Sequence, residues 1–463
     1  MAIVAISMVA IISMAALSID LGTLYEARAE AQRAADAAAL AAARVISLEG
    51  ITGDPTLGPS DGSWTDICGG AGSPASLAAI NVAQQNLIGG APAPAANINV
   101  YYGTSSGVGT STTCTGAGLG FTVNPIVQVK VRQPNLPTFF ARVFSLIFKG
   151  TSVNSGVSAT ATAEVFNSSG SGSVASGMIP VQPRCVKPWI IPNQDPDYAA
   201  NPFITASTGV IFDPGIYQLS GPGAGVIGES FDITANCKAG ASDCEIADGN
   251  MAPNPPIANA PAKKTYYLPA LISGTPVAVP SGSSCSISAG YQSAIAGCDQ
   301  STVYTCGTPS TGAGATQADL IENPLNPAGI SGDSPSATMC LINQLTGQDT
   351  LAGYPTAVTY PFQIQAGFGN PLVQAGVVNS NYVITSSNNI VTLPIADFGT
   401  TLLTGNTPAV SIVGFLQVFI NTVNPDGSMN VTVMNIDGCG NNAAGNSTVT
   451  GTSPVPIRLI TSP

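Results

Sequence analysis

The residues best able to carry chemistry in this chain are carboxylates and cysteines, because the sequence contains no histidine. Without histidine, the Ser/His/Asp and Cys/His arrangements, the histidine-based zinc protease motif and histidine acid–base catalysis are excluded. The Gly-rich stretch at residues 221–225 lacks the lysine, strand and helix that a phosphate-binding loop requires, and no local motif pairs carboxylates for glycoside hydrolysis. We therefore predict no catalytic residue, no cofactor and no enzymatic activity.

One group of oxygen-bearing side chains has the spacing of cation ligands. Asn193, Asp195 and Asp197 alternate within PNQDPDY, and carboxylate and amide oxygens suit calcium. However, Pro192 and Pro196 make the segment a rigid turn, and the sequence has no downstream glutamate at the calcium-loop spacing. Asp and Asn are also ordinary turn residues. The sequence therefore favours a turn over a metal site, and we predict no metal.

The cysteines point to disulfide bonds. The chain has ten, an even number, and no C-x-x-C pair, so the common zinc spacings are absent and disulfides are favoured over metal or free thiols. Short separations suggest Cys237 with Cys244, Cys285 with Cys298 or Cys306, and Cys68 with Cys114, although spacing does not determine connectivity. The disulfide candidates are Cys68, Cys114, Cys185, Cys237, Cys244, Cys285, Cys298, Cys306, Cys340 and Cys439.

Charge limits the partners of the chain. Only 8% of the 463 residues are charged, against about 25% in an average protein, and the formal net charge is −12. A surface made of uncharged polar residues is typical of secreted or surface-exposed proteins. The negative charge argues against nucleic acid or anionic lipid as a partner of the main body.

Residues 1–48 are predicted to form one continuous helix with two different halves. Residues 1–19 carry no charged side chain and reach the length needed to cross a bilayer, about 20 residues. From Asp20 onward the helix gains charges, and residues 34–43, AADAAALAAA, have side chains small enough for another helix to approach closely. A cleaved signal peptide is the alternative, but no basic region precedes the apolar run and no break follows it. We therefore predict a helix that spans a membrane, mediates assembly, or does both.

In the same segment the apolar run is followed by Asp20, Gly22, Tyr25, Arg28, Gln32 and the run AADAAAL at residues 34–40. This pattern resembles the N-terminal region of TadE/TadG-like proteins of the tight-adherence (Tad/Flp) pilus system. A second stretch, VQVKVRQPNLPTFFARVFSLIF with VSATATAEV, resembles the strand, helix and strand that often follow in this family. The resemblance implies a pilus-associated protein and assigns these residues to a family motif on an assembly helix: Asp20, Gly22, Tyr25, Arg28, Gln32, Ala34, Ala35, Asp36, Ala37, Ala38, Ala39 and Leu40.

Hydrophobic periodicity predicts two modules beyond the helix. Residues 49–166 form a small α+β module, with a helix near 73–88, strands at 96–102, 120–133 and 155–166, and an apolar helix at 137–148. The family resemblance implies that this module is pilin-like. The Gly/Ser-rich residues 167–177 form a linker. Residues 178–463 form a β-rich, disulfide-containing ectodomain, either a β-sandwich or a loop-rich β domain, with a hairpin around NPDG at 424–427 and a last strand at 455–460.

Taken together, we predict an α+β fold that is mostly β, in which a long N-terminal pilin-like helix precedes antiparallel β-rich extracytoplasmic domains. By resemblance to TadG, the leading hypothesis is a non-enzymatic anchoring or adhesive component of a Tad-type pilus, at the cell surface, held in the inner membrane or incorporated in the pilus. The alternative is a subunit of a helical extracellular filament with the helix in the fibre core. An enzyme acting on surface polymers is a third, disfavoured hypothesis. The predicted partners are the membrane, further copies of the chain or other pilus proteins, and a surface or carbohydrate ligand, but no nucleic acid.

Overall fold

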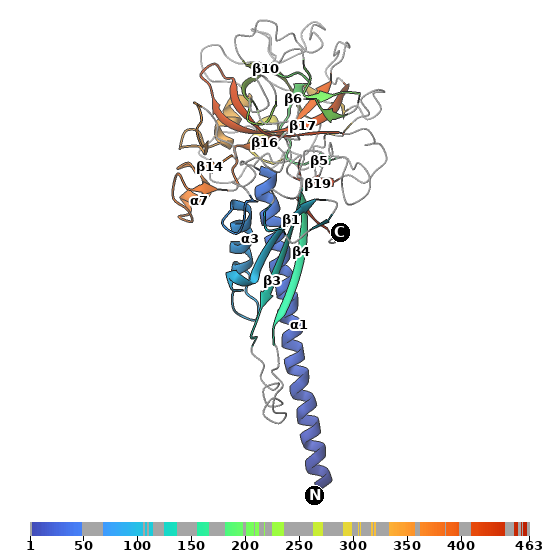
Figure 1. Cartoon of the computed structure of the whole chain (residues 1–463). Helices are drawn as coiled ribbons and strands as arrows, with labels where there is room; N and C mark the ends of the chain where they lie inside the picture. The colour runs from blue at the N-terminus through green and yellow to red at the C-terminus, as the bar shows by residue number, and fades with distance from the viewer. Residues whose placement is uncertain are drawn as a thin grey trace.

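The computed structural model describes an elongated stalk that carries a larger β-rich head (Figure 1). The stalk contains the N-terminal helix α1, and the head lies around the upper end of this helix. The residues described are 2–48, 68–104, 107–108, 111–113, 125–136, 155–165, 181–197, 201–207, 209–212, 217, 225–235, 263–271, 290–298, 304, 306, 316–317, 319–320, 333–356, 362–384, 386–397, 409–439, 449–451, 455 and 457–460.

Helix α1 (Ala2–Leu48) runs the whole length of the stalk, as expected from its lack of a strong helix breaker. Helix α3 (Pro74–Gln85) packs beside its upper half, and its proline lies in the first turn, where a missing N–H costs nothing. A short 3-10 turn, η2 (Ala95–Asn97), leads from α3 toward the sheet. The helix expected near 73–88 is confirmed.

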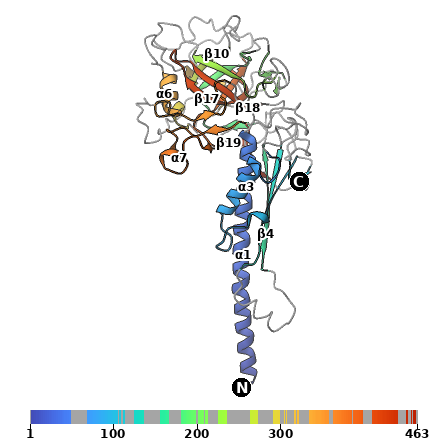
Figure 2. The same ribbon diagram turned by 60° about the vertical axis from the view of Figure 1, so that its left-hand side comes forward.

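An antiparallel sheet covers the other side of α1 (Figure 2). In the described residues it has five strands in the order β2-β1-β3-β4-β20. The strands are β1 (Ile98–Thr104), β2 (Gly107–Val108), β3 (Pro125–Gln133), β4 (Val157–Val165) and β20 (Ile457–Ile460). The last strand comes from the C-terminal end of the chain, and Ile457 pairs directly with Val165. The stalk is therefore built from segments that precede the head in the sequence and from one strand that follows it.

The core of the stalk is made mainly of small side chains. The helix contributes one alanine face, α3 adds Ala75, Ala79 and Ala83, and β4 adds Ala159, Ala161 and Ala163. Valines of β3 alternate with polar residues, so one face of that strand is buried. Small side chains let two helices and a sheet approach closely. The buried alanines of α1 are Ala27, Ala31, Ala34, Ala35, Ala38, Ala39, Ala42 and Ala43.

The head is built on a sheet that closes on itself. Among the described residues, six strands pair in the ring β17-β16-β6-β10-β9-β18, and β18 returns to β17. The strands are β6 (Trp189–Pro192), β9 (Ser230–Ala235), β10 (Lys264–Leu271), β16 (Ile390–Asp397), β17 (Ala409–Val423) and β18 (Met429–Gly438). Strands β11 (Thr316–Gln317) and β12 (Asp319–Leu320) extend it at β17 and β10. The described strands of the head therefore form a small barrel rather than a β-sandwich, which was one of the two predicted forms, and closure removes the exposed edges of a sheet.

Large apolar and aromatic side chains fill the head. Trp189, Phe231 and Phe419 are among its largest fully buried side chains. Along β6, Trp189 and Ile191 belong to the main core cluster, whereas Ile190 belongs to a second cluster on the other face of the strand. This alternation shows that both faces of the barrel wall are covered.

Shorter elements surround the barrel. The helices are α5 (Tyr291–Ala296), α6 (Asp333–Leu341) and α7 (Pro371–Gln374). The small sheets pair β5 (Val181–Pro183) with β19 (Val449–Gly451), β7 (Ile204–Thr205) with β8 (Val210–Ile211), and β13 (Thr350–Leu351) with β14 (Ile364–Gln365) and β15 (Val383–Ile384).

The predicted α+β, mostly β class is confirmed, with one refinement. The pairs β6–β16 and β9–β10 are parallel, so the barrel sheet is mixed rather than purely antiparallel, and the separate pair β5–β19 is parallel as well. The predicted hairpin is present: the N–H of Gly427, which has a φ of 83°, donates to the carbonyl of Asn424 at 2.9 Å. The apolar helix predicted at 137–148 and the linker at 167–177 lie outside the described residues.

Candidate functional site

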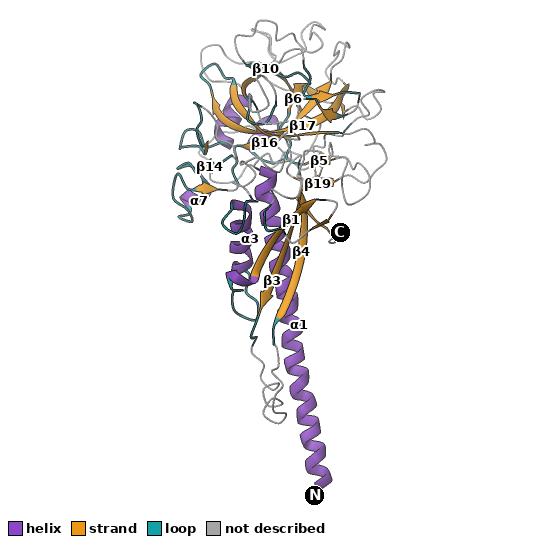
Figure 3. Ribbon diagram, viewed as in Figure 1, coloured by secondary structure: helices purple, strands orange, loops and turns teal. Residues whose placement is uncertain are grey.

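The lower half of α1 is an exposed apolar surface. Helix α1 extends well below the stalk sheet (Figures 1 and 3), and large side chains along it are about half to four-fifths exposed. Leu17, for example, is 54% exposed although residues 1–19 include no charged side chain. A soluble monomer rarely exposes an apolar patch of this extent. The exposed residues are Ile3, Val4, Met8, Ile11, Ile12, Met14, Leu17, Ile19, Leu21 and Tyr25.

The motif residues of the helix occupy two environments. Tyr25 and Arg28 are exposed, and a side chain added at Gly22 would meet nothing within 4 Å. Asp20 is buried. Further up, the side-chain amide of Gln32 donates to Asp36 Oδ1 at 2.8 Å and to the carbonyl of Thr160 on β4 at 3.3 Å. Gln32 of the motif therefore connects α1 to the stalk sheet of the same chain.

Much of the alanine-rich stretch is buried within the stalk of this chain. The sequence suggested that residues 34–43 form an assembly face, but Ala34, Ala35, Ala38 and Ala39 are fully buried inside the stalk, and Leu40 packs against the same core. Another helix does approach closely, as predicted, but it is α3 of the same chain. The apolar surface that α1 leaves exposed in this chain is consequently on its lower half.

Membrane insertion of α1 was a second sequence expectation. Within the part of the chain that the structure describes, no helix is long and apolar enough to cross a membrane. The transmembrane character predicted for residues 1–48 is therefore not supported.

In the head, the predicted oxygen cluster forms a turn. The amide of Asn193 is used twice on Ile204: its Nδ2 donates to the carbonyl at 2.7 Å, and its Oδ1 accepts from the N–H at 2.8 Å. The N–H of Asp197 donates to Asp195 Oδ1 at 2.8 Å, which is an Asx turn. In the described residues, no group of three or more Asp, Glu, Cys or His is arranged to hold a metal ion. Asn193 is thus committed to structure rather than to a cation.

A carboxylate that the sequence analysis did not identify lies near this turn. Glu229 is fully buried, and within the described part of the head its carboxyl oxygens make no close hydrogen bond; the backbone N–H of Asp197 lies near enough only to favour the charged form weakly. Burial raises the pKa of Glu229 well above its ordinary value, and the nearby charges of Asp195 and Asp197 raise it further. Lys263 opposes this effect, but its Nζ lies 3.0 Å from Asp197 Oδ2 and 2.8 Å from the hydroxyl of Tyr217. Glu229 therefore favours its neutral, protonated form.

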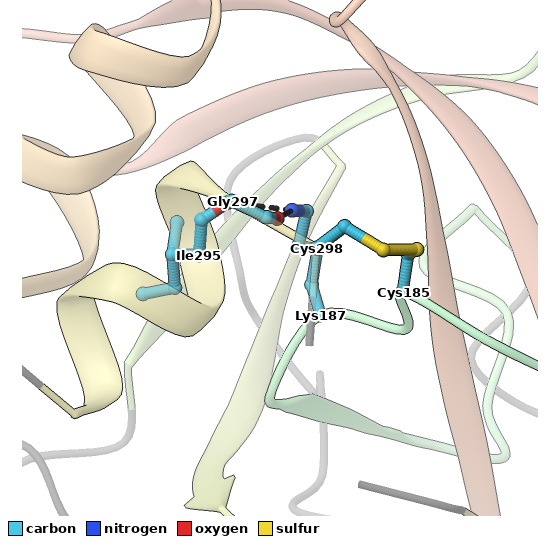
Figure 4. The surroundings of a disulfide bond; sticks show 5 residues. All are labelled: Cys185, Lys187, Ile295, Gly297 and Cys298. Carbon is cyan, nitrogen blue, oxygen red and sulfur yellow. Dashed lines mark hydrogen bonds between the residues drawn. A yellow bond between two sulfur atoms is a disulfide. The ribbon is translucent and has the colours of Figure 1, made fainter. Parts of the chain in front are cut away.

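Two disulfide bonds tie distant parts of the head together. Cys185 is bonded to Cys298 (Figure 4), and Cys306 to Cys439. Disulfide formation is confirmed, but the suggested pairing of Cys285 with Cys298 or Cys306 is wrong. The two cysteines of the first disulfide are 113 positions apart in the sequence, and those of the second are 133 positions apart. Strand pairing and packing bring them together, and this cannot be predicted from short sequence separations. Cys68 and Cys340 are also disulfide-bonded, and the other four cysteines lie outside the described residues.

Lys187 lies beside the first disulfide with its charge buried. Its Nζ donates to the carbonyls of Ile295 at 2.5 Å and Gly297 at 2.6 Å, at the end of α5 (Figure 4). Burial lowers the pKa of Lys187 to about 7. The sequence analysis did not single out Lys187 or Glu229, because a lone lysine or glutamate carries no local signal of burial.

Comparison with known proteins identifies the N-terminal segment. The family model Tad, described as "Putative Flp pilus-assembly TadE/G-like", matches residues 1–45. The resemblance to TadE/TadG-like proteins is thereby confirmed for this helix, and it supports a pilus-associated role at the cell surface. No curated protein and no solved structure matches the chain.

Proposed function

We propose that this chain is a non-enzymatic, pilus-associated surface component whose lower α1 half is held in an apolar environment and whose head is displayed outward. The observation that carries the proposal is the exposed apolar half of α1. About 25 cal/mol is gained for each Å² of apolar surface removed from water, so a run of such side chains strongly favours insertion among other apolar groups.

The TadE/G-like match extends over this same helix. It favours other pilus proteins as the source of the apolar groups that surround the lower half of α1. The membrane is a second source. The barrel head then supplies the anchoring or adhesive surface that the resemblance to TadG implies. In this proposal each predicted module has its own role: α1 mediates assembly, the pilin-like module lies above it, and the β-rich ectodomain is displayed outward.

The proposal is tested by placing charge on the lower half of α1. Cells that produce the wild-type chain should release it with sheared pili or retain it in the envelope fraction. The double variant Ile11→Glu/Ile12→Glu should move to the soluble fraction. As a matched control, Leu345→Glu alters a head residue that is 80% exposed and should leave the distribution unchanged. Equal distribution of the wild-type and the double variant would contradict the proposal.

A filament subunit is the second candidate, favoured by the same protruding helix. If lower halves of α1 from many copies pack together, the heads must decorate the outside of a fibre. Negative-stain images of the purified chain distinguish the two candidates. Fibres of this chain alone would establish the subunit role, whereas a detergent-dependent monomer would contradict it.

A further inference from the structure

The upper end of α1 meets the head at a cavity of about 310 Å³. Arg44 of α1 lines it on one side, and Lys187 lines it together with the disulfide Cys185–Cys298 on the head side. The volume lies at the lower end of the range of small-molecule pockets, roughly 300 to 1,000 Å³. The cavity is therefore large enough for a ligand about the size of one sugar residue.

The charges of this cavity are unbalanced. Arg44 is only partly exposed and its guanidinium has no ion pair or hydrogen bond among the described residues. Lys187 is buried and its hydrogen bonds go to two neutral carbonyls. No acidic side chain occurs among the described residues that line the cavity. A partly desolvated guanidinium beside a buried lysine that is about half protonated at neutral pH, with no carboxylate in the described lining of the cavity, is an unusual arrangement, because a buried charge is normally paired.

The rest of the lining suits a polar ligand body. Hydroxyl and amide side chains surround the cations, including Thr392 of β16 and Gln417 of β17. Such groups both donate and accept hydrogen bonds, as sugar hydroxyls require. Arg44 can present two parallel N–H groups to a carboxylate or a phosphate.

We propose that this cavity binds a small oxyanion, a carboxylate or phosphate carried on a body the size of a monosaccharide. The anion pairs with Arg44 and lies near Lys187, while the hydroxyl and amide lining binds the remainder of the ligand. Because Arg44 belongs to the stalk and Lys187 to the head, the ligand also joins the two parts. The site goes beyond the pilus-associated role, since it is independent of where the lower half of α1 inserts.

Calorimetric titration of the purified full-length chain tests this site. The probes are glucuronate, glucose 6-phosphate, inorganic phosphate and uncharged glucose. We expect saturable binding of glucuronate or glucose 6-phosphate, with phosphate at least tenfold weaker and glucose not bound. The charged sugar that binds identifies whether the oxyanion is a carboxylate or a phosphate.

Substitutions then locate the binding. Arg44→Gln should weaken it about tenfold or more, because a charge-assisted pair is lost, and Arg44→Lys should weaken it less. Arg33→Gln changes an exposed arginine of the same helix and should have no effect. Thermal unfolding confirms that each variant is folded. No binding of either charged sugar, equal binding of phosphate alone, or unchanged affinity in Arg44→Gln would overturn the proposal.

Discussion

The stalk and the head of this protein are stabilised by cores of opposite character. In the stalk, α1, α3 and β4 meet through alanines, and backbones lie close together. In the head, the barrel closes around aromatic and large aliphatic side chains such as Trp189 and Phe419. A close-packed alanine core buries little apolar area per residue and has no room for larger side chains. A core of large side chains loses much when one is shortened. The two parts should therefore respond oppositely to changes in side-chain volume.

The largest expected effect is a truncation in the head. Phe419→Ala removes a fully buried ring of β17 and should destabilise the head by about 3–5 kcal/mol, through lost burial and a cavity. Denaturant unfolding under oxidising conditions measures it. Phe368→Ala is the control, since Phe368 is 65% exposed and should cost far less. Equal costs would show that the aromatic core does not distinguish the head.

An enlargement in the stalk should have the next largest effect. Ala38 is fully buried on α1, so Ala38→Leu must displace its neighbours and should cost about 1–3 kcal/mol. Ala29→Leu, at an exposed position of the same helix, should be close to neutral. The unfolding of the stalk, followed by circular dichroism of its helices, is the measurement. A stabilising Ala38→Leu would mean that the stalk core is underpacked.

The buried Lys187 predicts a pH dependence for the stability of the head between pH 7 and 9. Its folded pKa of about 7 lies below the ordinary 10.5, so between these values the unfolded chain binds more protons and stability rises with pH. From pH 7 to 9 the gain is about 2 kcal/mol, at about 1.4 kcal/mol per pKa unit. Comparison of wild type with Lys187→Met over this range isolates the slope. A slope that persists in the variant would assign it to other groups.

The smallest effect is expected at the surface of the head hairpin. Asp426 Oδ1 accepts from the hydroxyl of Ser428 at 2.6 Å and from its N–H at 3.0 Å, and Lys264 lies 3.0 Å from Oδ2. These contacts, led by the Ser428 hydroxyl, lower the pKa of Asp426 to about 2. Because the pKa of Asp426 is lower in the folded chain than its ordinary value of 3.8, its ionised form stabilises the folded state at pH values above 3.8. This contribution is lost as the pH falls toward 2.

Because the Asp426 side chain is 59% exposed, solvent screens the interaction, and Asp426→Asn should cost less than about 1 kcal/mol at neutral pH. The difference from wild type should shrink below pH 3. A larger cost that persists at low pH would point to the turn conformation instead of the charge.

Much of the stalk could be predicted from the sequence because its signals are local. The continuous α1 follows from an uninterrupted run of helix-forming residues, and the alternation of Val127, Val129 and Val131 with polar residues predicts β3. The return of Ile457–Ile460 to the stalk sheet could not be predicted, because any apolar strand of that length can pair with several edges.

The head and its junction could be predicted only in part. The turn at Asn424–Gly427 has strong local preferences, so the hairpin was recognised, but closure of the barrel depends on pairings such as β9 with β18 that have no local signature. Likewise, Arg44 and Lys187 lie 143 positions apart, the difference of the two residue numbers, and only the docking of α1 on the head brings them to one cavity. The motif residues of α1 were found through family resemblance, and their assembly role remains a prediction.

The pairing of Val165 with Ile457 also determines how the molecule would carry force. The chain leaves the stalk at the end of β4 and re-enters it at the start of β20, so a pull on the head acts on two neighbouring strands in the same direction. Such a pull does not slide β4 against β20, and the tension passes into β3 and α1. A further tether is the hydrogen bond from Asn435 Nδ2 to the carbonyl of Ser47, 2.7 Å long, at the top of α1. Drag on the head is thereby delivered to the helix through several connections at once.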